Sequence, residues 1–300
     1  MKQRVITSIY IVLASVLAIL SKLLPNGIGN YIFDIFIVGI SVVAGFEICN
    51  MLEANKRKVN KFMASMYSIV NYIVLLLCVK RVLFYEILLI EIAVLFVYSA
   101  ISFVVEIIKN KNTSTKQHLI TSLNTLLACF YPGFLFCLLL NFNHADMYYA
   151  GFKHFSLVFI IIIFAITWLT DTFAYLVGRT FKGPKLAPTI SPNKTISGAI
   201  GGLLGGVSGS MLVFLLVKYV PDLSGILLQF SLSWWHFMLI GLCGSILGQM
   251  GDLFESKLKR NAGIKDSGNI FPGHGGMLDR IDAMIFISTF VYIVIFFILL

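Results

Sequence analysis

The sequence predicts an all-α protein, a polytopic bundle of transmembrane helices. Of its 300 residues, 58% are hydrophobic and 12% are charged, whereas soluble domains carry about 25% charged residues. The mean hydropathy is +0.91, which excludes a soluble globular protein. Apolar stretches of about 20 residues, the length that crosses a bilayer as a helix, recur along the whole chain. A bundle of spans is expected because each helix satisfies its own backbone hydrogen bonds.

About nine stretches have the length and composition of spans. In chain order they lie near residues 5–24, 31–52, 62–79, 82–108, 118–141, 154–178, 197–220, 234–252 and 281–300. The stretch 221–233 is ambiguous. The first stretch follows MKQR, as in a signal peptide, but it has no small-residue cleavage site, so we expect it to be retained as a span.

The distribution of basic residues predicts the orientation. With a cytoplasmic N-terminus, the loops on that side carry 18 Lys and Arg residues and the outer loops carry five. Under the positive-inside rule, this bias predicts a multi-pass protein of the cell membrane with its N-terminus in the cytoplasm. The polar loops 179–196 and 253–280 then both face the cytoplasm. The net charge of +9 does not indicate nucleic acid, because the sequence contains no continuous basic arm.

The seventh span is rich in glycine. Its glycines recur in small-xxx-small pairs, which let membrane helices pack closely. They are Gly198, Gly201, Gly202, Gly205, Gly206 and Gly209. We interpret them as a packing surface rather than as ligand contacts.

Acidic residues cluster beside the last two spans. Five of the fourteen acids lie within residues 252–282, and carboxylates at membrane helix ends indicate a functional site by default. Asp252 and Glu255 are i, i+3 neighbours, as are Asp279 and Asp282, so each pair shares a helix face. Two such faces meeting would form an oxygen-rich cage suited to Mg²⁺.

A glycine-rich turn, FPGHGG at residues 271–276, lies between these two pairs. Pro272 fixes its backbone, whereas Gly273, Gly275 and Gly276 allow positive φ and a close approach of main-chain amides to an anion. His274 is suited to hydrogen-bond a phosphate or to accept a proton. Composition alone supports two interpretations of the segment 252–282 almost equally. One is a functional site, and the other is a solvated connector whose charges orient the last helix.

The spacing of the segment SKLKRNAGIKDSGNIFPGHGGMLDRID resembles the signature of the phosphatidate cytidylyltransferase family, also called CDP-diacylglycerol synthase. Thirteen residues carry the resemblance: Ser256, Lys259, Arg260, Lys265, Asp266, Pro272, Gly273, His274, Gly275, Gly276, Asp279, Arg280 and Asp282.

A second segment, WLTDTFAYLVGRTFKGPKLAPTISPNKTISGAIGG at 168–202, is similar to the family's nucleotide-binding region. Ser197 stands where the family pattern has a glutamate, which removes an acidic side chain from this loop. The resemblance covers the C-terminal half. We therefore expect an N-terminal transmembrane region at 1–150 and a catalytic transmembrane region at 151–300, integrated into one membrane domain.

The resemblance implies that CTP and phosphatidate react to give CDP-diacylglycerol and pyrophosphate, in phospholipid biosynthesis. It implies Mg²⁺ as cofactor, with room for a second cation. The expected metal ligands are Asp252, Asp279, Glu255 and Asp282. The other expected catalytic residues, which neutralise phosphate charge or support the metal, are Lys259, Arg260, Lys265, Asp266, His274 and Arg280.

The same resemblance implies a set of substrate-binding residues. They are Asp171, Tyr175, Arg179, Lys185, Ser191, Lys194, Thr195 and Ser256. For Arg179 and Lys194 the alternative is that they only mark the cytoplasmic side. The expected partners are the two substrates and membrane lipid, and a homodimer is left open.

Two alternatives remain open from the residues. One is a CTP-dependent lipid kinase, or a cytidylyltransferase for another lipid. The other is an ion or phosphate transporter, which would place acids near the bilayer middle. Asp34 and Glu91 lie in mid-span, but the densest acidic cluster lies at helix ends.

Overall fold

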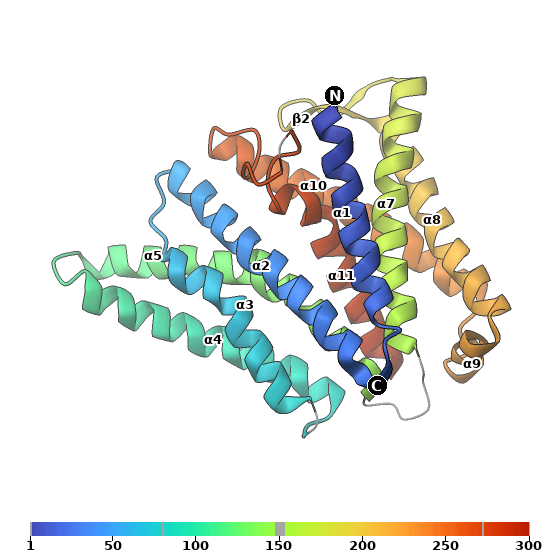
Figure 1. The fold of residues 1–300 in the computed structure, drawn as a ribbon. Coiled ribbons are helices and arrows are strands. Elements are labelled where there is room, and N and C mark those ends of the chain that lie inside the picture. The colour runs from blue at the N-terminus through green and yellow to red at the C-terminus, as the bar shows by residue number, and fades with distance from the viewer. Residues whose placement is uncertain (1, 80, 148–153, 272, 300) are drawn as a thin grey trace. The chain divides into compact units, whose positions relative to one another are not determined.

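The protein was examined as a computed structural model, which describes residues 2–79, 81–147, 154–271 and 273–299 (Figure 1). Pro272 of the glycine-rich turn and the expected boundary at 150/151 lie outside the described residues. Within those ranges, eight helices are long and apolar enough to cross a membrane. The predicted all-α polytopic fold is therefore confirmed, and the chain is a multi-pass membrane protein.

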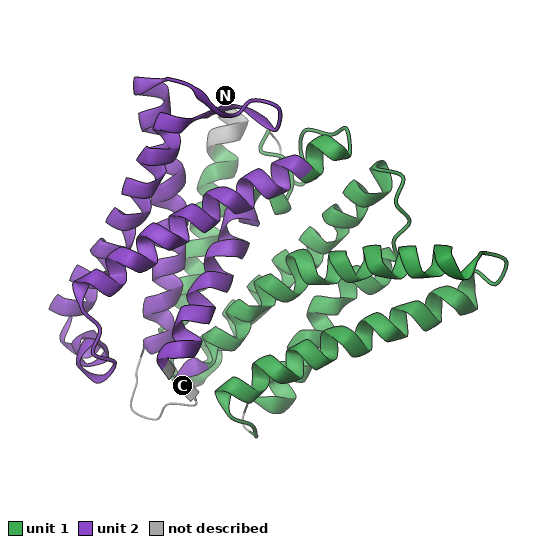
Figure 2. Cartoon of the chain, turned by 180° about the vertical axis from the view of Figure 1, so that it is seen from behind, with its two compact units in different colours: residues 1–144, 258–280 green, residues 145–257, 281–300 purple. Residues whose placement is uncertain are grey.

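The chain divides into two compact units (Figure 2). Unit 1 contains residues 1–144 and 258–280, and unit 2 contains residues 145–257 and 281–300. The first division falls close to the expected boundary, but the segment 258–280 groups with the N-terminal part. Both long C-terminal helices, α10 (Trp234–Asn261) and α11 (Leu278–Leu299), therefore belong to two units. The last residues of α10 and the first residues of α11 are in unit 1, and the rest of each helix is in unit 2.

Unit 1 is built mainly of helices. They are α1 (Lys2–Ser21), η1 (Pro25–Gly27), α2 (Ile28–Ala54), α3 (Lys61–Cys78), α4 (Phe84–Lys109), α5 (Thr115–Ala128), η2 (Cys129–Phe134) and α6 (Leu135–Asn143). In α1, the apolar stretch Ile6–Ser21 is shorter than the eight spans. The fifth expected span is interrupted within η2, where Pro132 cannot continue the backbone hydrogen bonding of a helix.

Helix α2 forms the centre of unit 1, where it packs against α1, α3 and α6. Phe33, Ile37, Ala44 and Ile48 are at most 1% exposed. They recur at helical spacing along one face, as expected for a helix that buries a stripe against its neighbours. Polar side chains are also buried along α2, namely Asp34, Ser41 and Glu47. One of these, Glu47, proves important for the site.

Unit 2 comprises η3 (Ala145–Met147), α7 (Phe155–Phe181), β1 (Lys185–Ala187), β2 (Ser191–Thr195), α8 (Ile196–Tyr219), α9 (Pro221–Gln229) and most of α10 and α11. The ambiguous stretch 221–233 forms the short helix α9. The strands form an antiparallel hairpin that pairs Lys185 with Thr195. The sequence analysis did not predict this hairpin.

The glycines of α8 pack against neighbouring helices, as predicted. A Cβ at Gly209 would lie 2.8 Å from the carbonyl oxygen of Ala165 in α7. On another face, a Cβ at Gly206 would lie 2.9 Å from the carbonyl oxygen of Gly241 in α10. Glycine therefore allows α8 to approach both helices closely, and this packing fixes the helices that carry the polar residues of unit 2.

Candidate active site

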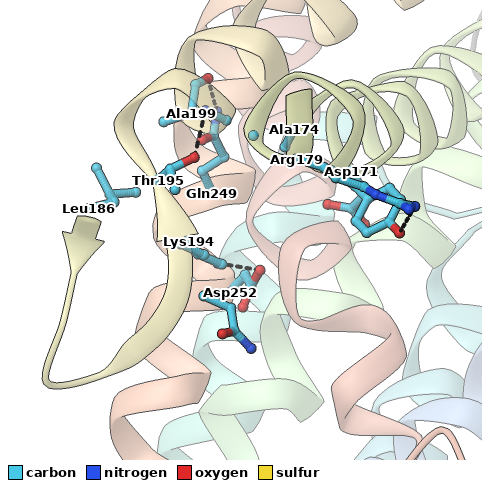
Figure 3. Close-up of a pocket in the computed structure, with 13 residues that line it drawn as sticks. Asp171, Ala174, Arg179, Leu186, Lys194, Thr195, Ala199, Gln249 and Asp252 are labelled. Carbon is cyan, nitrogen blue, oxygen red and sulfur yellow. Dashed lines mark hydrogen bonds and ion pairs between the residues drawn. The ribbon is translucent and has the colours of Figure 1, made fainter. Parts of the chain in front are cut away.

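A pocket of about 450 Å³ opens in unit 2 between α7, α8, α10 and the hairpin (Figure 3). Asp171, Tyr175 and Arg179 line it from α7, where their spacing of four residues places them on one helix face. The guanidinium of Arg179 donates a hydrogen bond of 3.0 Å to the hydroxyl of Tyr175. An aromatic ring and a cation thus lie together on one wall.

The opposite wall contains an ion pair. Lys194 of β2 pairs with Asp252 of α10, and both side chains are about 30% exposed, at 27% and 31%. In Figure 3 the Lys194 side chain points directly toward Asp252. Gln249 joins α10 to α8, since its amide donates to the carbonyl oxygen of Ala199 at 3.3 Å.

Thr195 both lines the pocket and begins the next helix. Its side-chain oxygen accepts a hydrogen bond of 3.1 Å from the amide of Gly198, which caps the N-terminus of α8. Ser197, at the departure from the family pattern, donates to the carbonyl oxygen of Lys182 and so ties the first turn of α8 to the C-terminal end of α7. Serine therefore has a structural contact at this position.

Four carboxylates interact in unit 2. The charges of Asp252, Glu255 and Asp171 act on Asp282 of α11. Glu255 is fully buried, and the hydroxyl of Ser256 lies 3.4 Å from Asp252. Like charges held close together in a partly buried site repel one another unless a cation compensates them.

A second polar group lies in unit 1, on the loop 262–277, hereafter the signature loop, and on the helix ends that flank it. Asp279 accepts hydrogen bonds from the ammonium of Lys259 at 2.5 Å, from the amides of Ser267 at 2.9 Å and Gly276 at 2.7 Å, and from the Ser267 hydroxyl at 3.0 Å. Both carboxylate oxygens of Asp279 are thus engaged by the protein itself.

A pocket of about 410 Å³ is formed by the signature loop and the start of α11. Its charged and titratable lining residues are Lys265, Asp266, His274 and Arg280. The turn is closed by hydrogen bonds between Phe271 and Gly275 and between His274 and Phe271. His274 also exchanges a 3.0 Å hydrogen bond with Ser8 of α1.

The predicted backbone of the turn is confirmed in part. Gly273 and Gly275 have φ values of 78° and 80°, the left-handed region that favours glycine. Gly276 has no such φ, so the prediction of a positive φ was wrong at this one position. A Cβ at Gly276 would displace the ends of the Ser267 and Glu47 side chains, and the Gly276 amide donates a hydrogen bond to Asp279.

The expected site residues thus form two groups. Unit 2 brings together Asp171, Tyr175, Arg179, Lys194, Thr195, Asp252, Glu255, Ser256 and Asp282. Unit 1 brings together Lys259 and Asp279, and separately Lys265, Asp266, His274 and Arg280. Arg260 bonds the carbonyl oxygen of Ile264. Lys185 and Ser191 are in the hairpin but line neither pocket.

Sequence analysis overlooked Glu47 of α2. Its carboxylate accepts hydrogen bonds from the amides of Met277 at 2.9 Å and Leu278 at 2.8 Å, and from the Ser267 hydroxyl at 2.9 Å. The available signal was its position as an acid in an apolar span, which indicates a functional residue by default.

The fold and these two groups define a multi-pass membrane protein with a carboxylate cluster and basic pockets suited to phosphates. The sequence model of the cytidylyltransferase family matches residues 2–298. The chain therefore belongs to the cytidylyltransferase family, and it is a nucleotidyltransferase. The match includes the N-terminal half, where the sequence had shown only an apolar region.

Several relatives are named phosphatidate cytidylyltransferase. One from Bacillus subtilis (strain 168) is 32% identical over 297 residues, covering 97% of this chain and 96% of the relative. One from Staphylococcus haemolyticus is 39% identical over 141 residues, 47% of this chain and 50% of the relative. One from Brucella abortus is 42% identical over 160 residues, 50% of this chain and 55% of the relative.

Proposed function

We propose that the protein is a phosphatidate cytidylyltransferase, which converts CTP and phosphatidate to CDP-diacylglycerol and pyrophosphate. The observation that carries this proposal is the similarity to the Bacillus subtilis enzyme, which extends over 97% of the chain. The two polar groups described above supply the charges that the reaction needs. Neither a lipid kinase nor a transporter is favoured by these comparisons.

In the proposed reaction, a phosphate oxygen of phosphatidate attacks the α-phosphorus of CTP. The bond between the α-phosphorus and the bridging oxygen breaks, and pyrophosphate leaves with that oxygen. Transfers of this kind are catalysed mainly by positioning and by neutralising charge on the phosphate oxygens. The chain therefore needs cations and hydrogen-bond donors around the phosphates rather than a covalent nucleophile.

The pocket of unit 2 is the proposed CTP site. Tyr175 offers a ring face for the base, and Arg179 beside it is suited to bidentate contact with a phosphate. Lys194 is paired with Asp252 in the described state. An incoming phosphate would compete with Asp252 for the Lys194 ammonium. The Asp252 carboxylate would then be available to bind a cation.

The pocket of the signature loop is the proposed site for the lipid phosphate. Lys265 and Arg280 provide two positive charges, and His274 provides a ring nitrogen. Lys259 instead neutralises Asp279, so its assigned role is to hold the loop. Asp279 is likewise assigned to positioning in this proposal.

Mg²⁺ is the proposed cofactor, and Asp252, Glu255 and Asp282 are the carboxylates from which it would draw one or two ligands. Among the described residues, no group of three or more His, Cys, Asp or Glu side chains is arranged to hold a metal by itself. Mg²⁺ usually takes one or two carboxylates and completes its shell with water and substrate phosphates, so the donor set fits. When bound, it would neutralise charge on the phosphate oxygens.

The proposed active site faces the cytoplasm, where CTP is available. The support is the excess of Lys and Arg in the loops on one side, 18 against five. The cell membrane is proposed as the location, because the chain is a multi-pass membrane protein and its proposed substrate CTP is cytoplasmic.

The direct test uses the purified full-length protein in detergent micelles or liposomes with labelled CTP, phosphatidate and Mg²⁺. We expect CDP-diacylglycerol and pyrophosphate in equal amounts, and no product when EDTA replaces Mg²⁺. Release of CDP with a newly phosphorylated lipid would instead identify a kinase. Absence of any product from folded protein would refute the proposal.

A further inference from the structure

Glu47 is a carboxylate inside an apolar helix, and only 4% of its surface is exposed. A buried charge in such a helix is costly unless it is hydrogen-bonded. Its partners come from residues 220 to 231 positions away in the sequence, in the signature loop and at the start of α11. The hydrogen bonds of Glu47 thus join the apolar helix α2 to the signature loop and to the first residue of α11.

The contacts of Glu47 complete the N-terminus of α11. The first amides of a helix have no partner within it and need an external acceptor. Here Met277 donates to one carboxylate oxygen of Glu47 and Leu278 to the other. Asp279 and Arg280 follow immediately, so Glu47 fixes the helix turn that carries both.

Ser267 links Glu47 to Asp279. Its hydroxyl lies 2.9 Å from Glu47 and 3.0 Å from Asp279, and one hydroxyl proton can serve either carboxylate. The fit is tight, because a Cβ at Gly268 would lie 2.8 Å from the carboxyl carbon of Glu47. A displacement of Glu47 would therefore disturb both Ser267 in the signature loop and the first amides of α11.

We propose that Glu47 is a positioning residue of the catalytic machinery: it holds the signature loop and the first turn of α11 in place for the proposed reaction. The expected consequence is on turnover, because the residues of the loop pocket would lose their positions. Binding of CTP would be affected less, because the proposed CTP pocket is built from other residues. This inference rests on the proposed function for its kinetic test.

The kinetic test compares Glu47→Gln, Glu47→Asp and Glu53→Gln. Glu53 also lies in α2, but it pairs with Lys61 and its side chain is 44% exposed, so it is a matched control. In Glu47→Gln an amide NH₂ would face backbone amides, which are also donors. We expect its kcat to fall about 100-fold, with the KM for CTP changed less than about 3-fold. Glu47→Asp keeps two acceptor oxygens and should recover about 10-fold.

A second measurement does not depend on activity. Hydrogen–deuterium exchange followed by mass spectrometry would monitor the peptide containing residues 276–279 in the wild type and in the variants. We expect exchange there to rise about 10-fold or more in Glu47→Gln, with no change in the helices of unit 2 or in Glu53→Gln. If Glu47→Gln does not accumulate as folded protein, Ser267→Ala replaces it in both measurements. The expected rise in hydrogen exchange at residues 276–279 is then smaller than for Glu47→Gln.

The outcomes separate the two proposals. Unchanged exchange at 276–279, or a kcat within about 2-fold of Glu53→Gln, would overturn the role of Glu47. A uniform loss of protection throughout the chain would also overturn it, because Glu47 would then support the fold in general. Increased exchange confined to the loop, together with a wild type that makes no CDP-diacylglycerol, would refute the proposed function and leave the positioning role intact.

Discussion

At the residue scale, Asp279 is a carboxylate with its hydrogen-bonding capacity largely used. The donors are two backbone amides, a hydroxyl and the Lys259 ammonium. Because a carboxylate accepts only, it suits a position where several donors converge. This explains why a neutral amide of the same shape would be a poor replacement.

We predict that Asp279→Asn lowers turnover about 100-fold, because its NH₂ would oppose at least one of these donors and shift the loop. The measurement is CDP-diacylglycerol formation by the purified variant. Asp222→Asn, at the exposed start of α9, is the control and should retain full activity. Retained activity in Asp279→Asn would remove Asp279 from the site.

Lys259 is buried together with its partner, with side-chain exposures of 11% for Lys259 and 6% for Asp279. We predict that Lys259→Met destabilises the protein by about 3–5 kcal/mol, because it leaves a buried carboxylate without its counter-charge. Adding Asp279→Asn to that variant should restore part of this loss. Unfolding in detergent is the measurement, and additive effects of the two substitutions would contradict the coupling.

The carboxylates of unit 2 give a separate prediction. We expect Asp282→Asn to raise the Mg²⁺ concentration for half-maximal activity about 10-fold or more, as loss of a metal-binding group does. A titration of activity against Mg²⁺ makes the comparison with wild type and Asp222→Asn. An unchanged Mg²⁺ requirement would exclude Asp282 from the cation site.

At the element scale, α7 and α8 of unit 2 pack together extensively. A Cβ at Gly205 would lie 2.8 Å from the backbone of Leu169 and from the side chain of Phe173 in α7. Backbone atoms cannot move aside as a flexible side chain can. The separation of the two helices, and so the position of Asp171 and Arg179, depends on this glycine.

We predict that Gly205→Val destabilises the protein by about 3 kcal/mol or more, at or above the upper end of the usual cost of overpacking. The reason is that α8 would have to move away from the backbone of α7. Gly225→Val in α9 is the matched control, since a Cβ there meets nothing within 4 Å. Thermal unfolding of the two variants in the same detergent makes the comparison. Equal unfolding temperatures would contradict the packing argument.

Elements differ in how well the sequence predicts them. The long helices were predictable because hydrocarbon requires apolar stretches of a fixed length. The hairpin was not, since β1 has three residues and β2 has five, including Pro192. The glycine face of α8 was predictable from its spacing, whereas its two different partners depend on tertiary packing.

At the scale of the whole molecule, the sequence located the candidate site but not its division into two groups. The i, i+3 spacing of Asp279 and Asp282 suggested one shared cage. In the structure Asp279 bonds within unit 1, whereas Asp282 interacts with carboxylates of unit 2. The contacts of Glu47 span more than 200 residues, and one sequence contains no signal for such a pairing.

The orientation of the whole chain can be measured directly. We predict that single cysteines introduced at Lys111 and Lys182 react with an impermeant maleimide only after the cell is opened, whereas one at Asp222 reacts from outside. The reason is the bias of Lys and Arg toward the loops expected in the cytoplasm. The native cysteines are replaced by alanine as background. The reverse labelling pattern would invert the topology.

The composition of unit 1 has a consequence for how this chain can be recombined with its relatives. A crossover at 144/145 looks natural, since it lies where one compact unit first gives way to the other. Such a crossover would join Glu47 from one parent to the Ser267–Leu278 segment of another, although the two fit together through specific backbone contacts. Functional chimeras should therefore inherit α2 and residues 258–280 from the same parent. The two segments act as one structural unit although they are far apart in the sequence.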